Sequence, residues 1–468
     1  MARVGILIVA LTLASSPSTP AGAAPREPDW PAATAEYKAL LADLIAVDSS
    51  NPPGDELKVA AVLRARLEAA GIPCDTVQTA PGRGNLVARL KGSGKKRPLL
   101  LLGHIDVVGV DRAKWGSDPF QMTERDGHYY GRGVIDDKGM VAAEAMTLIL
   151  LKRQNVRLDR DIILLAECDE EAGGEMGVGW MLKNRRPMID AEFAINEGGR
   201  TSLDGGTVAW VGVQNCEKRS VNMRLVAHGT SGHASMPRQD NCIAALGRAL
   251  ARFADPVFPA ELTPATTAFF TALAPRQHDP ALAHAMAHLD HPDSAETFSR
   301  IVGADIMYSS MLRTSVSPTL VNGGFRSNVI PSTAEATLNV RMIPGTHPDS
   351  VAARLRRVID DPQVEVTFTP PTRPEAPGVP FSGAVVQAVQ KVSARMAPGV
   401  PVVPLLSTGA TDSAQLREAG IQAYGLLPFP LTTEDVGGMH GDNERMPVGS
   451  LGFGLEMMYR VTREVAGR

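Results

Sequence analysis

The sequence predicts an α/β protein in which a smaller α+β domain is inserted into a larger domain built on a mixed sheet. Helical and buried-strand patterns alternate in the first half of the chain and again near its end, which is typical of a sheet covered by helices. Between these segments apolar and polar residues alternate, as they do in half-exposed strands. A length of 468 residues also exceeds that of one ordinary domain.

The elements of the larger domain follow in chain order. Helical apolar spacing covers residues 36–47 and 56–70, and a third helix is predicted at 138–154. Apolar runs predict strands between and after these helices at 97–103, 161–166, 191–196, 402–406 and 421–427. Two further helices are predicted near the C-terminus, at 350–360 and 450–465.

The inserted domain is predicted from a change in periodicity. Residues 218–228 and 334–342 alternate as half-exposed strands, and 240–254 has helical spacing. We therefore expect the inserted domain at 217–344, between a first part of the larger domain at 30–216 and a second part at 345–468. The Pro-rich stretch at 370–380 is interpreted as a surface loop.

The N-terminus has the residue order of a secretory leader. A basic start is followed by an apolar run over residues 6–14 that is too short to span a bilayer, and small residues then allow cleavage after Ala23. We expect a signal peptide at residues 1–23 and a secreted or periplasmic mature chain. Later segments contain no long apolar run, so no membrane span is expected in the mature chain.

Charge and cysteine content limit the possible partners and cofactors. A formal net charge of -4 provides no basic surface for nucleic acid or for an anionic membrane. The four cysteines are widely spaced and form no metal-binding CxxC pattern. Both disulfide pairing in an oxidising compartment and buried free thiols are compatible with that spacing.

A first group of polar residues follows the apolar strand predicted at 97–103. His104 comes at its end, where α/β sheets keep their sites, and Asp106 lies two residues on along the same face. An imidazole at such a place can ligate a metal, and a carboxylate can accept its other N–H; a structural histidine is the alternative. Asp136 and Asp137 stand in a glycine-flanked turn before a helix, where one acid can bridge two cations or simply cap the helix.

Acidic residues gather after two more predicted strands. Glu170 and Glu171 belong to a group of four acids directly after the strand at 161–166, and Glu197 follows the strand at 191–196. Such crowding is unfavourable without cations, although a solvated acidic loop remains the alternative. Together with His104 and a C-terminal His440, these acids offer mixed nitrogen and oxygen ligands, which suit two zinc ions better than calcium or magnesium.

These motifs resemble those of the co-catalytic zinc family that includes aminoacylase, acetylornithine deacetylase, succinyl-diaminopimelate desuccinylase, glutamate carboxypeptidase and carboxypeptidase S. The resemblance spans nearly the whole mature chain and is carried by residues 103–108, 131–139, 169–171, 196–198, 229–235 and 327–331. Within the family, residues 311–322 and the long inserted domain resemble carboxypeptidase S and the secreted N-acyl-amino-acid hydrolases. The resemblance implies a zinc-peptidase fold in which the inserted domain is a lid and a dimerisation domain.

The resemblance also implies roles for single residues. It makes His104, Asp136 and Glu197 the ligands of one zinc, and Asp136, Glu171 and His440 those of the other, so that each subunit binds two zinc ions, with cobalt or manganese as substitutes. Asp106 then orients His104. Glu170 becomes the general base, which agrees with the need for one acid of the Glu170–Glu171 pair to stay free for proton transfer.

Residues of the inserted domain are implied in substrate binding. In a homodimer, His233 would reach the neighbouring subunit's site to stabilise the oxyanion. Asn328 would contact the substrate, and Arg341 would bind the substrate's carboxylate; an ordinary strand arginine is the alternative for Arg341. Gly409, in the second part of the larger domain, would also contact the substrate. Ala414 occupies a place where many relatives carry a substrate-binding arginine, which argues against a diacid substrate such as succinyl-diaminopimelate.

The expected activity is zinc-dependent hydrolysis of an amide bond next to a carboxylate-bearing amino acid. A dipeptide, a peptide C-terminus and an N-acyl amino acid all offer such a bond, so the substrate stays open between them. The competing hypothesis is an extracytoplasmic binding or scaffold protein of the same fold without catalysis. That hypothesis predicts missing ligands, whereas competent residues occupy all five ligand positions and the base position.

Overall fold

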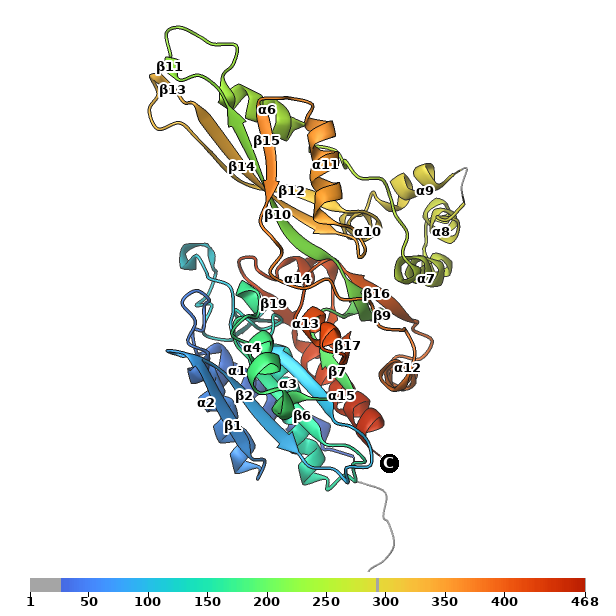
Figure 1. The fold of residues 1–468 in the computed structure, drawn as a ribbon. Coiled ribbons are helices and arrows are strands. Elements are labelled where there is room, and N and C mark those ends of the chain that lie inside the picture. The colour runs from blue at the N-terminus through green and yellow to red at the C-terminus, as the bar shows by residue number, and fades with distance from the viewer. Residues whose placement is uncertain (1–26, 292–293, 468) are drawn as a thin grey trace, which may run out of the picture.

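The computed structural model describes residues 27–291 and 294–467 (Figure 1). The leader expected at residues 1–23 lies outside the described residues. Two parts of the chain stand apart in Figure 1, a larger helix-covered domain and a smaller one extending from it. Among the described residues, no helix combines the length and apolar character that a membrane crossing requires.

The larger domain contains a ten-stranded mixed sheet, which confirms the predicted fold class. Its strand order is β1-β2-β6-β3-β7-β17-β9-β8-β18, and β16 pairs with β9. Neighbours β6, β3, β7 and β17 are parallel to one another, and β18 is parallel to β8. The pairs β1–β2, β2–β6 and β8–β9 are antiparallel. The strands are β1 (Cys74–Ala80), β2 (Arg83–Leu90), β3 (Leu99–His104), β6 (Ile162–Glu167), β7 (Phe193–Asn196), β8 (Arg200–Asp204), β9 (Thr207–Glu217), β16 (Val402–Ser407), β17 (Gln422–Gly425) and β18 (Pro430–Leu431).

Helices cover both faces of this sheet with separate apolar clusters. One cluster joins the sheet to α1 (Trp30–Ile45), α2 (Glu56–Ala69), α3 (Lys138–Arg153), α12 (Ala384–Met396) and α15 (Val448–Ala466). The other contains side chains of α4 (Val178–Asn184), α5 (Arg186–Ile189) and α13 (Ser413–Glu418). A small sheet of β4 (Thr123–Arg125), β5 (His128–Tyr130) and β19 (Arg445–Pro447) contacts α14 (Thr433–Gly437) through the ion pair of Arg445 with Asp435.

The smaller domain, called the lid below, has a four-stranded sheet in the order β12-β14-β10-β15. Its strands are β10 (Arg219–His228), β12 (Ser315–Gly323), β14 (Thr333–Met342) and β15 (Val364–Phe368), with α6 (Cys242–Ala251) and α11 (Pro348–Ile359) packed on one face. Both α11 and β15 follow the boundary expected at residue 344. Because β15 pairs with β10 along five residues, we propose that the lid extends to Phe368.

Two further parts of the lid lie away from its four-stranded sheet. The short strands β11 (Gly232–His233) and β13 (Val329–Ile330) pair at the end of the lid that is farthest from the larger domain (Figure 1). In contrast, α7 (Pro264–Leu273), α8 (Pro280–Ala287), α9 (Ala295–Val302) and α10 (Ile306–Leu312) share an apolar cluster with Trp210 and Leu405 of the large sheet. These helices therefore pack against the larger domain. All four cysteines are free thiols.

Candidate active site

The proposed site residues follow strands that lie side by side in the large sheet. His104 ends β3, Glu170 and Glu171 follow β6, and Glu197 follows β7. Because β3 is parallel to both β6 and β7, the carboxyl ends of the three strands meet at one edge. Gly103 allows the turn before α3 to approach the end of β3 closely, since a Cβ there would stand 2.5 Å from Oδ2 of Asp137. Sheet topology thus brings together residues that are distant in the sequence.

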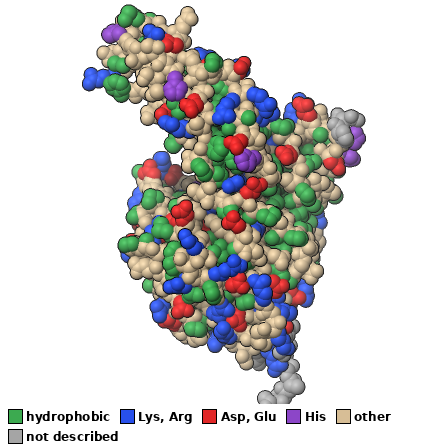
Figure 2. Space-filling view, in the orientation of Figure 1, with side chains coloured by type: hydrophobic (Ala, Val, Ile, Leu, Met, Phe, Trp, Pro, Cys, Tyr) green, Lys and Arg blue, Asp and Glu red, His purple; other side chains and the backbone are tan. Residues whose placement is uncertain are grey.

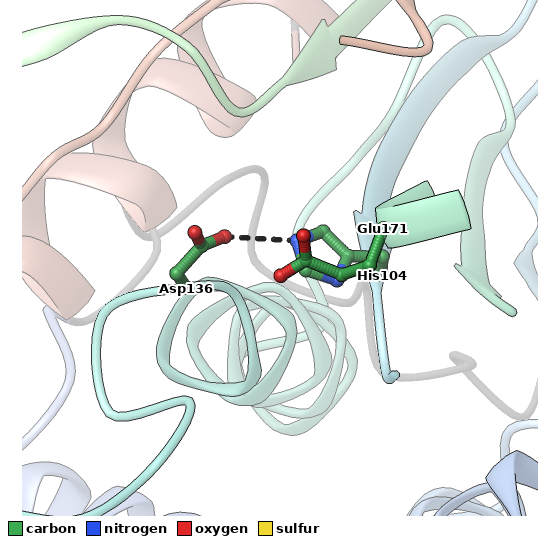
Figure 3. Close-up of side chains that lie close together, drawn as sticks. All are labelled: His104, Asp136 and Glu171. Atoms are coloured by element: carbon green, nitrogen blue, oxygen red, sulfur yellow. Dashed lines mark hydrogen bonds and ion pairs between the residues drawn. The ribbon is translucent and has the colours of Figure 1, made fainter. Parts of the chain in front are cut away.

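Asp136 lies between two imidazoles just before α3. Its Oδ1 is 2.9 Å from Nε2 of His104, and its Oδ2 is 3.0 Å from Nε2 of His440. Glu171 completes this group, with Oε2 at 3.2 Å from the same His440 nitrogen. Figure 3 shows Asp136 and Glu171 beside His104, approaching it from different elements. The two carboxylate oxygens of Asp136 therefore contact two different histidines.

Glu197 and Glu170 face His104 in a second group. Single ligand atoms of these three residues all lie within 4.8 Å of one another. Burial raises the pKa of Glu197 well above its usual value, and the negative charges of Glu170 and Asp136 raise it further. In addition, Oε1 of Glu171 is buried and has no hydrogen-bond partner within the described part of the chain. The cluster therefore lacks sufficient positive charge and has a free carboxylate oxygen.

Two residues of these loops have left-handed backbone conformations. Asp169 has φ 75°, and its side chain accepts a hydrogen bond from the Met176 amide at 3.0 Å. His440 has φ 62°. Residues other than glycine keep such conformations where the surrounding structure holds them, which is common at functional sites.

Asp106 has a broader structural role than orienting His104. Nδ1 of His104 is 2.9 Å from the backbone oxygen of Asp106 and 3.5 Å from its carboxylate. The carboxylate also accepts the backbone N–H groups of Glu170 and Glu171, each at 3.2 Å. Asn51, which the sequence reasoning did not identify, donates to it at 2.8 Å. Asp106 thereby connects the end of β3 to the loop that carries both glutamates.

Arg373 is a site residue that the sequence reasoning missed. Its guanidinium is 2.6 Å from Oε1 of Glu170 and 3.2 Å from Asp412. Burial raises the pKa of Glu170 to about 8, while the charge of Arg373 acts in the opposite direction. Arg373 lies in the stretch interpreted as a surface loop, yet its side chain is only 14% exposed. A lone arginine among prolines gave no sign of this contact.

Glu444 is a second residue that the sequence reasoning did not assign. It is fully buried and is 2.8 Å from the guanidinium of Arg132. It also accepts the backbone N–H groups of Gly133, Ile135 and Asp136 at 2.8 to 3.0 Å. Its place four residues after His440 was visible in the sequence. The contact joins the segment of His440 to the turn that presents Asp136.

The structure separates the predicted lid residues into two groups. His233 and the exposed Asn328 lie at the β11–β13 end of the lid, away from the carboxylate cluster of the same chain. Arg341 is partly buried on β14 and donates to Asn339 at 2.9 Å. Its pKa is lowered mainly by burial and also by the charge of Arg373, while Glu170 acts in the opposite direction. Arg341 is therefore near the cluster, whereas His233 and Asn328 are not.

A cavity of about 360 Å³ opens beside the carboxylate cluster. Glu170, Glu197 and His440 line one part of it, together with Gly409. Much of the remaining wall is apolar, with side chains that include Met307, Met311, Leu405, Leu427 and Val436. A cavity with apolar walls and a few convergent polar groups is the usual form of a small-molecule site.

Fold and site together define a class of metal-dependent hydrolase with a lid domain. Peptidase family M20/M25/M40 matches residues 100–464, and the chain belongs to this family, as the motif resemblance predicted. The chain therefore belongs to a class of hydrolases that act on peptide or linear amide C–N bonds.

Relatives and solved structures agree with this assignment. The chain is 30% identical to the N-fatty-acyl-amino acid synthase/hydrolase PM20D1 of Xenopus tropicalis, over 75% of this chain and 69% of that protein. It is 27% identical to the probable carboxypeptidase S-like 2 of Dictyostelium discoideum, over 78% of this chain and 71% of that protein. The fold resembles that of human carnosine dipeptidase 1, with a TM-score of 0.67 and 17% identity, over 93% of this chain and 98% of that chain. It also resembles the Sulfolobus solfataricus metallo-carboxypeptidase Sso-CP2, with a TM-score of 0.68 and 19% identity, over 92% of this chain and 99% of that chain.

Proposed function

We propose that this chain is an exported two-zinc amidohydrolase that releases an amino acid from an acyl or peptidyl group. The observation that carries the proposal is the position of Asp136, whose two oxygens face two different histidines. Export rests on the leader predicted at residues 1–23. A dinuclear metal-binding peptidase of the same family, Bacillus subtilis YXEP, shares the fold with a TM-score of 0.58.

The donor set fits two zinc ions. Ligand atoms around a tetrahedral zinc lie about 3.3 Å apart when the metal–ligand bonds are about 2.0 Å. The nitrogen–oxygen separations within the cluster are 2.9 to 3.2 Å. His104, Asp136 and Glu197 would hold one ion, and Asp136, Glu171 and His440 the other. The unpartnered Oε1 of Glu171 and the crowded acids also favour a resident cation.

The proposed mechanism assigns the proton transfers to Glu170. Two bound zinc ions would lower the pKa of the attacking water and polarise the scissile carbonyl. Glu170 accepts a proton from that water and then donates it to the nitrogen of the leaving amine. Arg373 holds one carboxylate oxygen of Glu170 at 2.6 Å and so fixes its direction. The partner subunit's His233 stabilises the negative charge that develops on the carbonyl oxygen.

The proposed substrate is a small peptide or an N-acyl amino acid. Arg341 would hold the carboxylate of the amino-acid half, with Asn328 and Gly409 as further contacts. Relatives of this chain are named for fatty-acyl amino acids and for carboxypeptidase S, and a neighbour in fold is a carnosine dipeptidase. The apolar cavity wall agrees with an apolar acyl group or side chain next to the scissile bond.

A Glu170→Ala variant tests the proposal. The zinc-loaded protein is incubated with dipeptides and with N-acetyl, N-lauroyl and N-succinyl amino acids, and the released amine is measured. We expect the variant to keep its zinc and to lose roughly 10²- to 10⁴-fold in turnover. Glu175→Ala, which removes an exposed acid from the same loop, is the matched control. Wild-type protein that binds zinc but hydrolyses no substrate would favour the non-catalytic alternative.

A further inference from the structure

Arg200, the first residue of β8, is a buried cation that the proposed mechanism does not use. It lines the cavity beside the carboxylate cluster, and the whole residue is 7% exposed. Its neighbours Glu197 and Gly199 line the same cavity. A buried guanidinium normally has a carboxylate partner, because removing the charge from water is costly. The contacts of Arg200 therefore need an explanation.

The surroundings of Arg200 provide weak partners. One terminal nitrogen is 2.7 Å from the sulfur of Met307, a poor acceptor, and the other donates to the hydroxyl of Thr433 at 3.1 Å. Nε is buried without a partner. The guanidinium carbon lies 5.5 Å from the ring centre of Trp210, which gives a cation–π contact. No acidic side chain of the described residues forms an ion pair with Arg200.

The contacts of Arg200 lie outside the carboxylate cluster. They are made with Met307 of α10, Thr433 of α14 and Trp210 of β9. In contrast, Glu197 lies with His104 and Glu170 inside the cluster. The substrate's α-carboxylate lies within two bonds of the scissile nitrogen, so its anchor must stand near the cluster. A remote cation in the same cavity is placed to bind a more distant group.

We propose that Arg200 binds an anionic end group of the substrate, so that the arm filling the cavity is an apolar chain that ends in a carboxylate. This inference rests on the proposed amidohydrolase function. Met307, Met311 and Leu405 would contact the chain, and the guanidinium of Arg200 would bind its end through a charge-assisted hydrogen bond. Ala414 does not argue against this terminal carboxylate, because Ala414 lines a separate cavity beside Glu217 and not the cavity that Arg200 lines.

Matched substrates test the inference on the zinc-loaded full chain. N-acyl leucines from butanoyl to dodecanoyl are compared with the corresponding carboxylate-ended series from succinyl to dodecanedioyl. The dipeptides Glu-Leu and Gln-Leu test whether a side-chain carboxylate can take the same place. We expect wild-type kcat/KM to favour a carboxylate end by roughly 10- to 100-fold, since a hydrogen-bonded charge contributes about 1.5–3 kcal/mol.

Variants separate a binding role from a structural one. Arg200→Met should abolish the preference, mainly by raising KM for the carboxylate-ended series, and Arg200→Lys should keep part of it. Arg160→Met is the matched control, because Arg160 is also buried and stacks over an aromatic ring, that of Phe193, outside the cavity. The control should leave the preference unchanged. Equal loss of both series in Arg200→Met, or no preference in the wild type, would overturn the inference.

A binding measurement distinguishes this inference from the proposed function. Calorimetry compares suberate with octanoate on the zinc-loaded wild type and on Arg200→Met. Tighter binding of suberate that depends on Arg200 supports the inference even if no amide is hydrolysed, in which case only the proposed function fails. Equal affinities for the two acids would contradict it even in an active enzyme.

Discussion

Glu170 and Glu171 are adjacent in the chain but have different partners. Glu171 is 3.2 Å from His440, whereas Glu170 is 2.6 Å from Arg373. Both backbone N–H groups donate to Asp106, which fixes the turn between them. Arg373 occupies one oxygen of Glu170 and opposes the rise of its pKa, which reaches about 8, so this group can exchange a proton near neutral pH without serving as a metal ligand. Arg373 therefore provides a physical reason why Glu170, rather than its neighbour, is the proposed base.

Replacing Arg373 should change the pH dependence of activity. The charge of Arg373 lowers the pKa of Glu170, so Arg373→Gln should raise that pKa. A base must be ionised to act, and the acidic limb of the kcat/KM profile should therefore move to higher pH. Arg373→Lys keeps the charge and should move the limb less. An unchanged acidic limb in Arg373→Gln would contradict the assigned contact.

Lys218 should make stability depend on pH. It is fully buried where β9 passes into β10, and burial lowers its pKa from 10.5 to about 7. Between these values the unfolded chain binds one proton more than the folded chain, so stability rises with pH by at most roughly 1.4 kcal/mol per pH unit. The thermal midpoint of the wild type, relative to Lys218→Met, should rise from pH 7 to pH 9.5. Lys152→Met, at an exposed lysine, should show no such trend.

At the scale of elements, the site depends on a contact between two distant segments. Glu444 precedes β19 and binds the turn before α3 through Arg132 and three backbone N–H groups. This contact keeps His440 near Asp136, although the two residues are about 300 positions apart in the chain. The turn and the C-terminal segment therefore act as one support for the cluster.

Removing the Glu444 side chain should weaken both stability and metal binding. Glu444→Ala leaves Arg132 buried without its partner, which typically costs about 3–5 kcal/mol. We expect a lower unfolding midpoint in urea and weaker zinc binding in competition with a chelator. Glu434→Ala is the control, because that exposed carboxylate pairs only with Arg445 among the described residues. Equal stability of the two variants would contradict the supporting role.

At the scale of the whole molecule, the lid carries His233 away from the site of its own chain. Several large apolar side chains are exposed on the lid around β12 and the β11–β13 end: Met236, Ile243, Leu320, Val321 and Phe325. In Figure 2, hydrophobic side chains are visible at the outer end of the lid. Exposed apolar groups of this kind are frequent at interaction surfaces. They support the proposed homodimer, in which His233 would act in the partner's site.

The proposed dimer predicts a change in mass. Val321→Glu combined with Phe325→Glu places two charges on this surface, at residues that are 70% and 78% exposed in the wild type. We expect light scattering to show half the wild-type mass and kcat to fall, because the partner's His233 is lost. Ile306→Glu, at an exposed side chain of α10, should keep the wild-type mass. A wild-type monomer with full activity would refute the shared site.

Periodicity predicted most elements because burial imposes it locally. The helix expected at 138–154 is α3, and the strand expected at 161–166 is β6, each within one residue at both ends. Within the inserted domain, β10 and β14 were visible in the sequence as alternating strands. The following α11 and β15, which we assign to the lid, resume a helix–strand order that a linear pattern cannot distinguish from that of the larger domain.

The sequence by itself determined the α/β class, the family and the residues gathered after β3, β6 and β7, because strand ends and motif spacing are local properties. Only the tertiary structure decided which charges meet. Arg373 reaches Glu170 from about 200 positions away, and Arg200 remains without an acidic partner among the described residues. Local patterns do not encode such pairings, since they arise when separate segments fold against one sheet edge.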